Sequence, residues 1–180
     1  MEHKEIALKS MIRPMMVEDV PRVAEIHVFG QRKAYQGIMP DKFLFGTINV
    51  AKRMEFFKDI LEKGYWDGYV YDDGIIRGFI VIGQCEDADK TKAFKLERIF
   101  VDPLMSGKGI GTVLEQFFTD EASKRGFNEL CLWVVEGNAA AIRFYENKGY
   151  KIESVKMTKD TEYTMVRYTK ILDSVTPEMV

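Results

Sequence analysis

A glycine-rich segment, residues 106–112, lies between an apolar run and a helical pattern. The apolar run Leu96–Val101 predicts a buried strand, Asp102-Pro103 predicts a turn, and apolar residues recur at helical spacing from Ile110. The start of a helix leaves backbone N–H groups unpaired and carries the positive end of the dipole, so it attracts phosphate. The glycines would let a ligand approach this backbone closely.

The glycine pattern differs from the two best-known nucleotide-binding loops. A nucleotide P-loop has Gly-Lys followed by Ser or Thr, but here Lys108 is followed by Gly109. A dinucleotide-binding fingerprint has a third glycine at the position of Thr112. We therefore expect neither ATP nor NAD as the ligand.

A second block, Asn138–Tyr150, reads Asn-Ala-Ala-Ala-Ile-Arg-Phe-Tyr-Glu-Asn-Lys-Gly-Tyr. The two blocks, in this order, resemble the Gcn5-related N-acetyltransferase (GNAT) family, and the resemblance covers nearly the whole chain. The pyrophosphate loop of that family has Arg or Gln, two residues, Gly, one residue, and then Gly or Ala. Gly109 and Gly111 match it, whereas Ser106 stands at the Arg or Gln position. This departure would weaken one contact to coenzyme A and leave the backbone contacts in place.

The resemblance implies direct transfer of an acetyl group from acetyl-CoA to a primary amine of a small molecule, in a ternary complex. Such an amine has a pKa near 10.4, so removing its proton at pH 7 costs roughly 4 kcal/mol. Glu97 matches the position that many family members use for the general base, acting directly or through water. The alternative is a strand carboxylate that pairs with Arg98 or Lys95 at the surface.

Tyr145 stands at the family's tyrosine position and would return a proton to the leaving thiolate, unless it is only a packed helix aromatic. Backbone N–H groups of Ile99–Val101 would stabilise charge on the attacked carbonyl and pair with the pantetheine arm. The resemblance implies cofactor contacts at Ile99, Phe100, Val101, Ser106, Gly107, Lys108, Gly109, Ile110, Gly111, Thr112, Asn138, Ala141, Phe144 and Tyr145.

Tyr35 and Trp133 are the candidate substrate-binding residues, because the segments around them resemble uncharacterised small-molecule and polyamine branches of the family. An aromatic such as Tyr35 could equally fill the core. A polyamine would need an acidic groove. The candidate acids for such a groove are Glu86, Asp87, Asp89 and Glu136.

Two other functions fit the resemblance. One is acetylation of a peptide or protein N-terminus, and the other is a regulatory domain that binds acyl-CoA without turnover. Ser106 at the Arg or Gln position favours the regulatory domain, whereas the presence of Glu97 and Tyr145 favours an enzyme.

These residues require a sheet and helices to position them. The resemblance implies an α/β (α+β) fold, with a mixed, mostly antiparallel central sheet of about seven strands, a splayed parallel pair and about four flanking helices. The patterns predict strands over Lys9–Met15, Tyr65–Tyr71, Ile75–Cys85, Leu130–Val135, Lys151–Met157 and Tyr163–Ile171. They predict helices that begin at Asp19, Val50, Ile110 and, for about three turns, Asn138.

The strand before the glycine-rich segment changes its alternation. Phe94 and Leu96 share one parity, whereas Ile99 and Val101 share the other. We therefore predict a β-bulge between residues 97 and 98, because an extra residue reverses which side chains face inward. The alternative is a strand buried on both faces, in which Phe100 also points into the core.

Composition sets broader limits. The 180 residues predict one domain over residues 1–180, with a core over 10–172 and a tail at 173–180. A formal net charge of -2 argues against binding to duplex nucleic acid. The chain shows neither a membrane-spanning run nor a signal peptide, which favours a cytoplasmic location.

The remaining reactive side chains are predicted to be structural. Cys85 and Cys131 lie in apolar runs without metal-ligand spacing, so we expect buried free thiols and no metal site. His27 lies on the apolar face of the first helix and is expected to pack there. A homodimer is compatible with the sequence.

Overall fold

Seven strands and four α-helices make up the fold. The computed structural model describes residues 11–157 and 163–172. The strands are β1 (Ile12–Pro14), β2 (Asp67–Asp72), β3 (Ile76–Gln84), β4 (Phe94–Val101), β5 (Glu129–Val135), β6 (Lys151–Met157) and β7 (Thr164–Ile171). The α-helices are α2 (Val20–Tyr35), α3 (Val50–Lys63), α4 (Ile110–Lys124) and α5 (Ala139–Glu146). Short helical turns are η1 (Val17–Asp19), η2 (Lys42–Thr47) and η3 (Pro103–Met105).

The strands form one mixed sheet in the order β1-β2-β3-β4-β5-β7-β6. The β4–β5 pair is parallel and the other neighbouring pairs are antiparallel, which confirms the predicted fold class. The first strand is shorter than predicted, and residues 9 and 10 of that prediction lie outside the described residues, as does the predicted tail.

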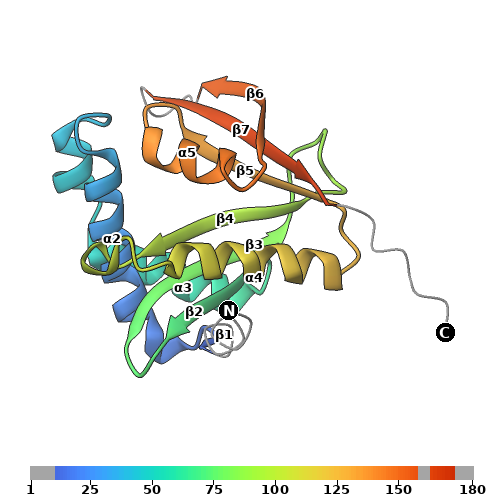
Figure 1. Cartoon of the computed structure of the whole chain (residues 1–180). Helices are drawn as coiled ribbons and strands as arrows, with labels where there is room; N and C mark the ends of the chain where they lie inside the picture. Colours follow the sequence, from blue (N-terminus) through green and yellow to red (C-terminus); the bar gives the residue numbers. More distant parts are fainter. Residues whose placement is uncertain (1–10, 158–162, 173–180) are drawn as a thin grey trace.

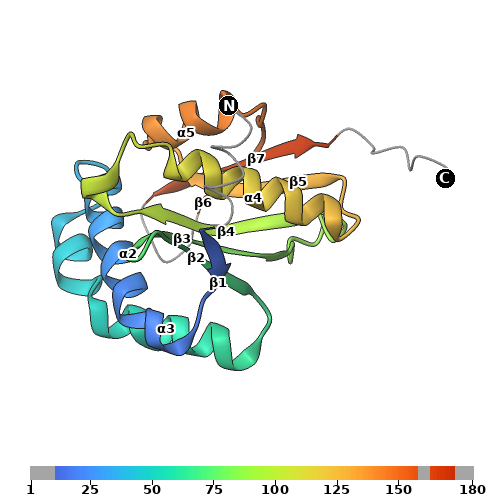
Figure 2. The same cartoon turned by 60° about the horizontal axis from the view of Figure 1, so that its bottom comes forward.

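Helices cover both faces of the sheet, with α4 and α5 on one face and α2 and α3 on the other (Figure 1, Figure 2). Strand β3 lies between the two layers, so its side chains alternate between two cores. Ile80 and Ile82 pack beneath α4, whereas Phe79 and Val81 pack against α2 and α3. Each such side chain contributes roughly 1.5–3 kcal/mol when it is fully buried.

Strand β4 contains the predicted bulge. Arg98 pairs with Val81 and Leu96 pairs with Ile82, so Glu97 is the extra residue in the β3–β4 ladder. The insertion reverses the alternation of β4, because two consecutive residues then oppose a single residue of the partner strand.

The change of alternation is visible in the packing of β4. Leu96 before the bulge, and Ile99 and Val101 after it, all pack in the core beneath α4. Phe100 packs in the opposite core, against α2 and α3. The bulge prediction is therefore confirmed, and Phe100 also points into a core, as its alternative had it.

Strands β4 and β5 pair only over a short length. Phe94–Leu96 pairs with Leu130–Leu132, and beyond Leu96 the two strands diverge (Figure 1). The predicted splayed parallel pair is thus present. It leaves one edge of β4 unpaired along Glu97–Val101.

Asparagine side chains cap the starts of α3 and α5. Asn49 Oδ1 accepts a hydrogen bond from the Lys52 N–H at 3.0 Å at the start of α3, and Asn138 Oδ1 accepts one from the Ala141 N–H at 3.2 Å at the start of α5. Helix α5 has 8 residues, so the predicted three turns are too many. The chain leaves the helix early because the Tyr150 N–H turns back to the Tyr145 carbonyl.

The structural roles predicted for the cysteines and for the helix histidine are confirmed. Cys85 and Cys131 are free and buried. His27 is fully buried and packs edge-on against Phe57 and Phe79, at centroid distances of 5.4 and 5.6 Å. Within residues 11–157 and 163–172, no helix is both long and apolar enough to cross a membrane.

Candidate active site

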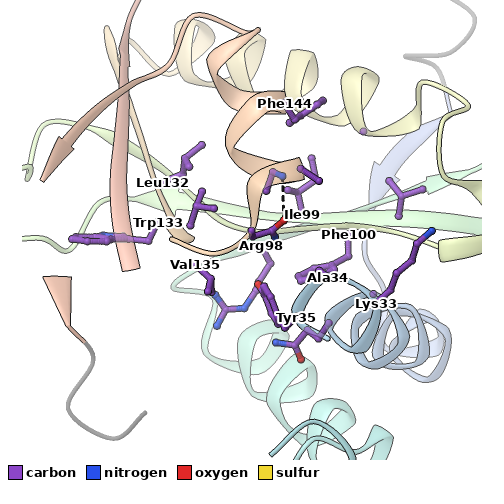
Figure 3. Close-up of a pocket in the computed structure, with 18 of the residues that line it drawn as sticks. Lys33, Ala34, Tyr35, Arg98, Ile99, Phe100, Leu132, Trp133, Val135 and Phe144 are labelled. Atoms are coloured by element: carbon purple, nitrogen blue, oxygen red, sulfur yellow. Dashed lines mark hydrogen bonds between the residues drawn. The ribbon is translucent and has the colours of Figure 1, made fainter. Parts of the chain in front are cut away.

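A cavity of about 620 Å³ lies where β4 and β5 separate, a volume typical of ligand-binding pockets. Its walls come from α2, α3, β4, β5 and α5, together with residues at the start of β7. Figure 3 shows Phe144 of α5 on one side of β4 and Tyr35 of α2 on the other. The cavity therefore crosses the sheet through the gap between its parallel strands.

Most of the predicted site residues meet at this cavity. Those that line it are Tyr35, Glu97, Ile99, Phe100, Val101, Ser106, Gly111, Trp133, Asn138, Ala141, Phe144 and Tyr145. Four predicted cofactor contacts are exposed and lie outside its lining, namely Gly107, Lys108, Gly109 and Thr112. Ile110 buries its side chain in the core beneath α4, so it could reach a ligand only through its backbone.

The glycine-rich segment forms an open loop before α4. Gly107 and Gly109 have φ angles of 80° and 84°, in the left-handed region that favours glycine. A Cβ atom at either position would have no neighbour within 4 Å. Gly109 is the N-cap residue and has no side chain to cap α4. The N–H groups of the first turn therefore remain available to an anion.

Glu97, the extra residue of the bulge, lies between two cationic side chains. Its carboxylate pairs with Lys95 Nζ at 3.0 Å and with Arg98 Nη1 at 2.6 Å. The side chain is 18% exposed, and that exposed part lines the cavity. The pairing that the alternative expected is therefore present, and Glu97 is also one of the residues that line the cavity.

Tyr145 reaches the cavity from α5 and is only 7% exposed. Its ring packs edge-on against Phe144 and Tyr150, at centroid distances of 5.2 and 5.6 Å. Burial raises the pKa of the Tyr145 phenol above its ordinary value. The hydroxyl therefore keeps its proton at neutral pH, as a proton donor must.

Trp133 lines the cavity from β5, and contacts with Asp87 and Arg167 hold its indole in place. Trp133 Nε1 donates a hydrogen bond to Asp87 Oδ2 at 2.8 Å, and the Arg167 guanidinium lies over its ring, 5.5 Å from the centroid. Arg167 also pairs with Asp87 at 3.1 Å and with Asp89. Two of the four acids expected to form an acidic groove are thus neutralised by an internal arginine.

The sequence prediction missed several residues at the α2–α3 end of the cavity. They are Gln31, Met39, Arg53, Arg98, Tyr163 and Met165. Arg53 offered a signal, because it is spaced four and seven residues from Phe57 and Ile60 and so shares the apolar face of α3. The others depend on contacts between distant segments, which leave no local pattern.

In the part of the chain that the structure describes, no group of three His, Cys, Asp or Glu side chains is placed so that it could hold a metal ion.

Comparisons with known proteins agree with this geometry. An uncharacterized N-acetyltransferase of Methanocaldococcus jannaschii is 29% identical over 147 residues, covering 80% of this chain and 62% of that protein. The [ribosomal protein bS18]-alanine N-acetyltransferase of Escherichia coli is 39% identical over 61 residues, covering 34% of this chain and 41% of the relative. The chain therefore spans less than two thirds of the length of either relative.

A solved structure shares the fold. The PaiA N-acetyltransferase of Thermoplasma acidophilum, in complex with coenzyme A, superposes with a TM-score of 0.68 at 21% identity, covering 89% of this chain and 97% of that chain. The model of the acetyltransferase (GNAT) family matches residues 32–150, which include β4, the glycine-rich loop and α5. With that match over more than half of its length, the chain belongs to the GNAT family of acetyltransferases.

Proposed function

We propose that this protein transfers an acetyl group from acetyl-CoA directly to the primary amine of a small molecule. The observation that carries the proposal is the meeting of Glu97 and Tyr145 at one cavity, which opens beside the glycine-rich loop. A candidate proton acceptor on β4 and a candidate proton donor on α5 thus line the same cavity.

The residues of the loop and of α5 fit coenzyme A. The open glycine loop and the uncapped first turn of α4 offer backbone N–H groups for the pyrophosphate. Asn138, Ala141 and Phe144 line the adjoining wall, where the pantetheine arm would lie. Ser106 lines the cavity as well, so a hydroxyl replaces the longer side chain that the family usually has there. Acetyl-CoA would supply the activated acyl group as a thioester.

Each catalytic side chain has a distinct task. Glu97 would accept the proton that an ammonium must lose before its nitrogen can form the new C–N bond, directly or through water. Tyr145 would give its proton to the sulfur as the C–S bond breaks. Backbone N–H groups on the unpaired edge of β4, between Ile99 and Val101, would stabilise the charge on the carbonyl oxygen.

A second candidate function is acetylation of a protein N-terminus. The E. coli relative, whose name gives an alanine of ribosomal protein bS18 as its target, supports it over 61 residues. The charged lining at the α2–α3 end favours a small molecule, because several side chains there would contact a compact acceptor at once. A regulatory domain without turnover is disfavoured by the retention of both Glu97 and Tyr145.

Thermal unfolding with and without acetyl-CoA tests the cofactor. At 100 times its dissociation constant, a ligand that binds only the folded state adds about 2.7 kcal/mol to the free energy of unfolding. We expect acetyl-CoA to raise the melting temperature, and ATP and NAD to leave it unchanged.

A thiol-release assay over a panel of primary amines and peptides then tests the reaction. Release of coenzyme A with small amines supports the proposal. Release with peptides alone would establish the second candidate in its place, and a protein that acetyl-CoA does not stabilise would contradict both.

A further inference from the structure

Two arginines meet at the α2–α3 end of the cavity. Arg53 comes from α3 and Arg98 from β4, and both line the cavity. The bulge at Glu97 brings Arg98 onto the side of the sheet that faces α3. Burial, together with the nearby positive charge of Arg98, lowers the pKa of Arg53.

Arg53 lacks the partners that other half-buried arginines have, since even Arg32, which has no ion pair among the described residues, donates to the carbonyls of Leu44 and Ile48. Arg13, Arg22, Arg125 and Arg167 each pair with at least one carboxylate. Among the described residues, no carboxylate lies within ion-pair distance of Arg53, and its buried Nε has no hydrogen-bond acceptor. A desolvated guanidinium without a partner costs free energy, unless a ligand supplies the missing anion.

Arg98 also has hydrogen-bond donors without an acceptor among the described residues. Its Nη1 donates to the Glu97 carboxylate at 2.6 Å and to the Glu97 carbonyl at 2.7 Å, while no described group accepts from its other two nitrogens. Gln31 lines the same end of the cavity, and its buried Oε1 has no partner. The side-chain amide can be turned so that its NH₂ group faces the cavity instead.

The charges around the cavity are predominantly positive. Lys33, Arg53 and Arg98 line it, whereas Glu97 is the one acidic lining residue of the described chain. The nearby acids Asp87 and Asp89 are paired with Arg167. A second positive charge on the acceptor would therefore meet repulsion, and a negative charge would meet attraction.

We propose that Arg53 and Arg98 bind an anionic group of the acceptor, so that the preferred substrate is an amine that also carries a carboxylate or a phosphate. The inference rests on the proposed acetyl transfer and specifies its substrate class. Guanidinium groups suit this task because their planar donors match carboxylate and phosphate oxygens. The inference also predicts that polyamines are poor substrates.

Matched acceptors test the charge requirement directly. An aminoalkanoate, an aminoalkyl phosphate, an alkylamine and a diaminoalkane of equal chain length share the same reacting amine and differ at the far end. We expect kcat/KM to be at least about 10-fold higher for one of the two anionic acceptors than for the alkylamine, and lowest for the diamine. Comparison of the carboxylate with the phosphate identifies the anion. Equal rates for all four, or a preference for the diamine, would overturn the inference while leaving acetyl transfer established.

The variant Arg53→Gln should lower kcat/KM for the anionic acceptor by about 10–100-fold and change the value for the alkylamine by less than about threefold. The loss should fall mainly on KM. Arg53→Lys should restore part of the preference, because it keeps the charge and lacks the planar fork. The exposed Lys58→Gln on the same helix is the matched control and should leave the ratio unchanged. A loss shared equally by both acceptors would mean that Arg53 is only structural.

A binding measurement separates this inference from the proposed reaction. Calorimetric titration of the chain with the N-acetylated aminoalkanoate, in the presence of coenzyme A, reports anion binding without turnover. Binding that Arg53→Gln weakens, in a protein that acetylates no amine, would retain the anion site and refute the proposed function. Binding that is the same in both proteins would refute the anion site.

Discussion

Glu97, the proposed proton acceptor, also forms ordinary ion pairs. Its partners, Lys95 and Arg98, are neighbours on the same strand, and each contacts a different carboxylate oxygen. These pairs do not prevent chemistry, because each carboxylate oxygen has a further lone pair that can accept a proton. Only loss of the carboxylate at constant size distinguishes the two roles.

We expect Glu97→Gln and Tyr145→Phe each to lower kcat by about 10²–10⁴-fold, as loss of a general base or acid does. Both substitutions preserve side-chain volume, so the acetyl-CoA-induced rise in melting temperature should remain. Steady-state thiol release and thermal unfolding measure the two effects. The exposed Glu55→Gln and Tyr65→Phe serve as controls. Undiminished turnover in the double variant E97Q/Y145F would remove both residues from the mechanism.

His27 makes stability depend on pH. It is fully buried, no group in the described part of the chain pairs with its ring nitrogens, and burial lowers its pKa well below the ordinary value, with Arg98 and Arg53 adding to the effect. Below about pH 6.5 the unfolded chain binds a proton that the folded chain does not, so stability falls as the pH falls.

The free energy of unfolding should therefore decrease between about pH 7 and 5, by up to about 1.4 kcal/mol per pH unit. The variant His27→Phe should lose this dependence, because Phe suits a site already lined by Phe57, Phe79 and Phe100. Urea unfolding at several pH values measures it, with His3→Gln as the control. A slope that persists in His27→Phe would assign the effect to another group.

The missed arginine illustrates a limit at this scale. A charged residue in an amphipathic helix is usually solvated, and the position of Arg53 on the apolar face was the only sign that it is not. Its approach to Arg98 depends on the packing of α3 against a strand about 40 residues further along, which no local pattern encodes. Glu97 and Tyr145, by contrast, lie within local motifs that marked them as candidates, and both line the cavity.

At the scale of elements, capping residues and helix-ending glycines mark the element boundaries in the sequence. Helix α3 begins at Val50, as predicted, since Asn49 caps its start, and Gly64, with φ of 65°, ends it. The bulge in β4 was predicted from the alternation of its apolar residues. Side chains of a strand point alternately to the two faces of the sheet, and an extra residue reverses that alternation. The length of α5 was overestimated because its closing turn depends on a backbone bond from Tyr150 to Tyr145.

Gly111 allows affinity and stability to be separated within one element. It lies in the first turn of α4 and lines the cavity, and a Cβ there would come no closer than 3.9 Å to Phe144 and Val101. Gly111→Ala should keep or raise the melting temperature, since alanine is the better helix former by up to about 1 kcal/mol. The methyl group should reduce the acetyl-CoA-induced shift, because it occupies space where a ligand would approach the backbone.

Differential scanning fluorimetry with an acetyl-CoA titration measures both quantities. The exposed Gly46→Ala, whose nearest neighbour would be Lys42 Cγ at 4.0 Å, is the control. An unchanged acetyl-CoA affinity in Gly111→Ala would place the cofactor elsewhere.

At the scale of the whole molecule, only the resemblance supplied the splayed parallel pair, and the order of the strands was not predicted. Strand β7 lies between β5 and β6, and β4 and β5 are joined through α4, so the sheet depends on pairings between distant segments. Composition and periodicity identify the strands but carry little information on such non-local pairings. The site depends on the same pairings, because it lies where two of these strands separate.

The short β4–β5 ladder also divides the sheet into two groups of strands, here called panels. One panel, β1 to β4, carries Glu97 and Arg98. The other, β5 to β7, packs beside α5, which follows β5 and carries Tyr145. Three residue pairs form the spine between them, at Phe94–Leu96 and Leu130–Leu132. A molecule bound in the gap would contact both panels at once. The spacing between Glu97 and Tyr145 therefore depends on these three pairs. If both residues act as proposed, mutations in the pairs should lower the rate without changing either side chain.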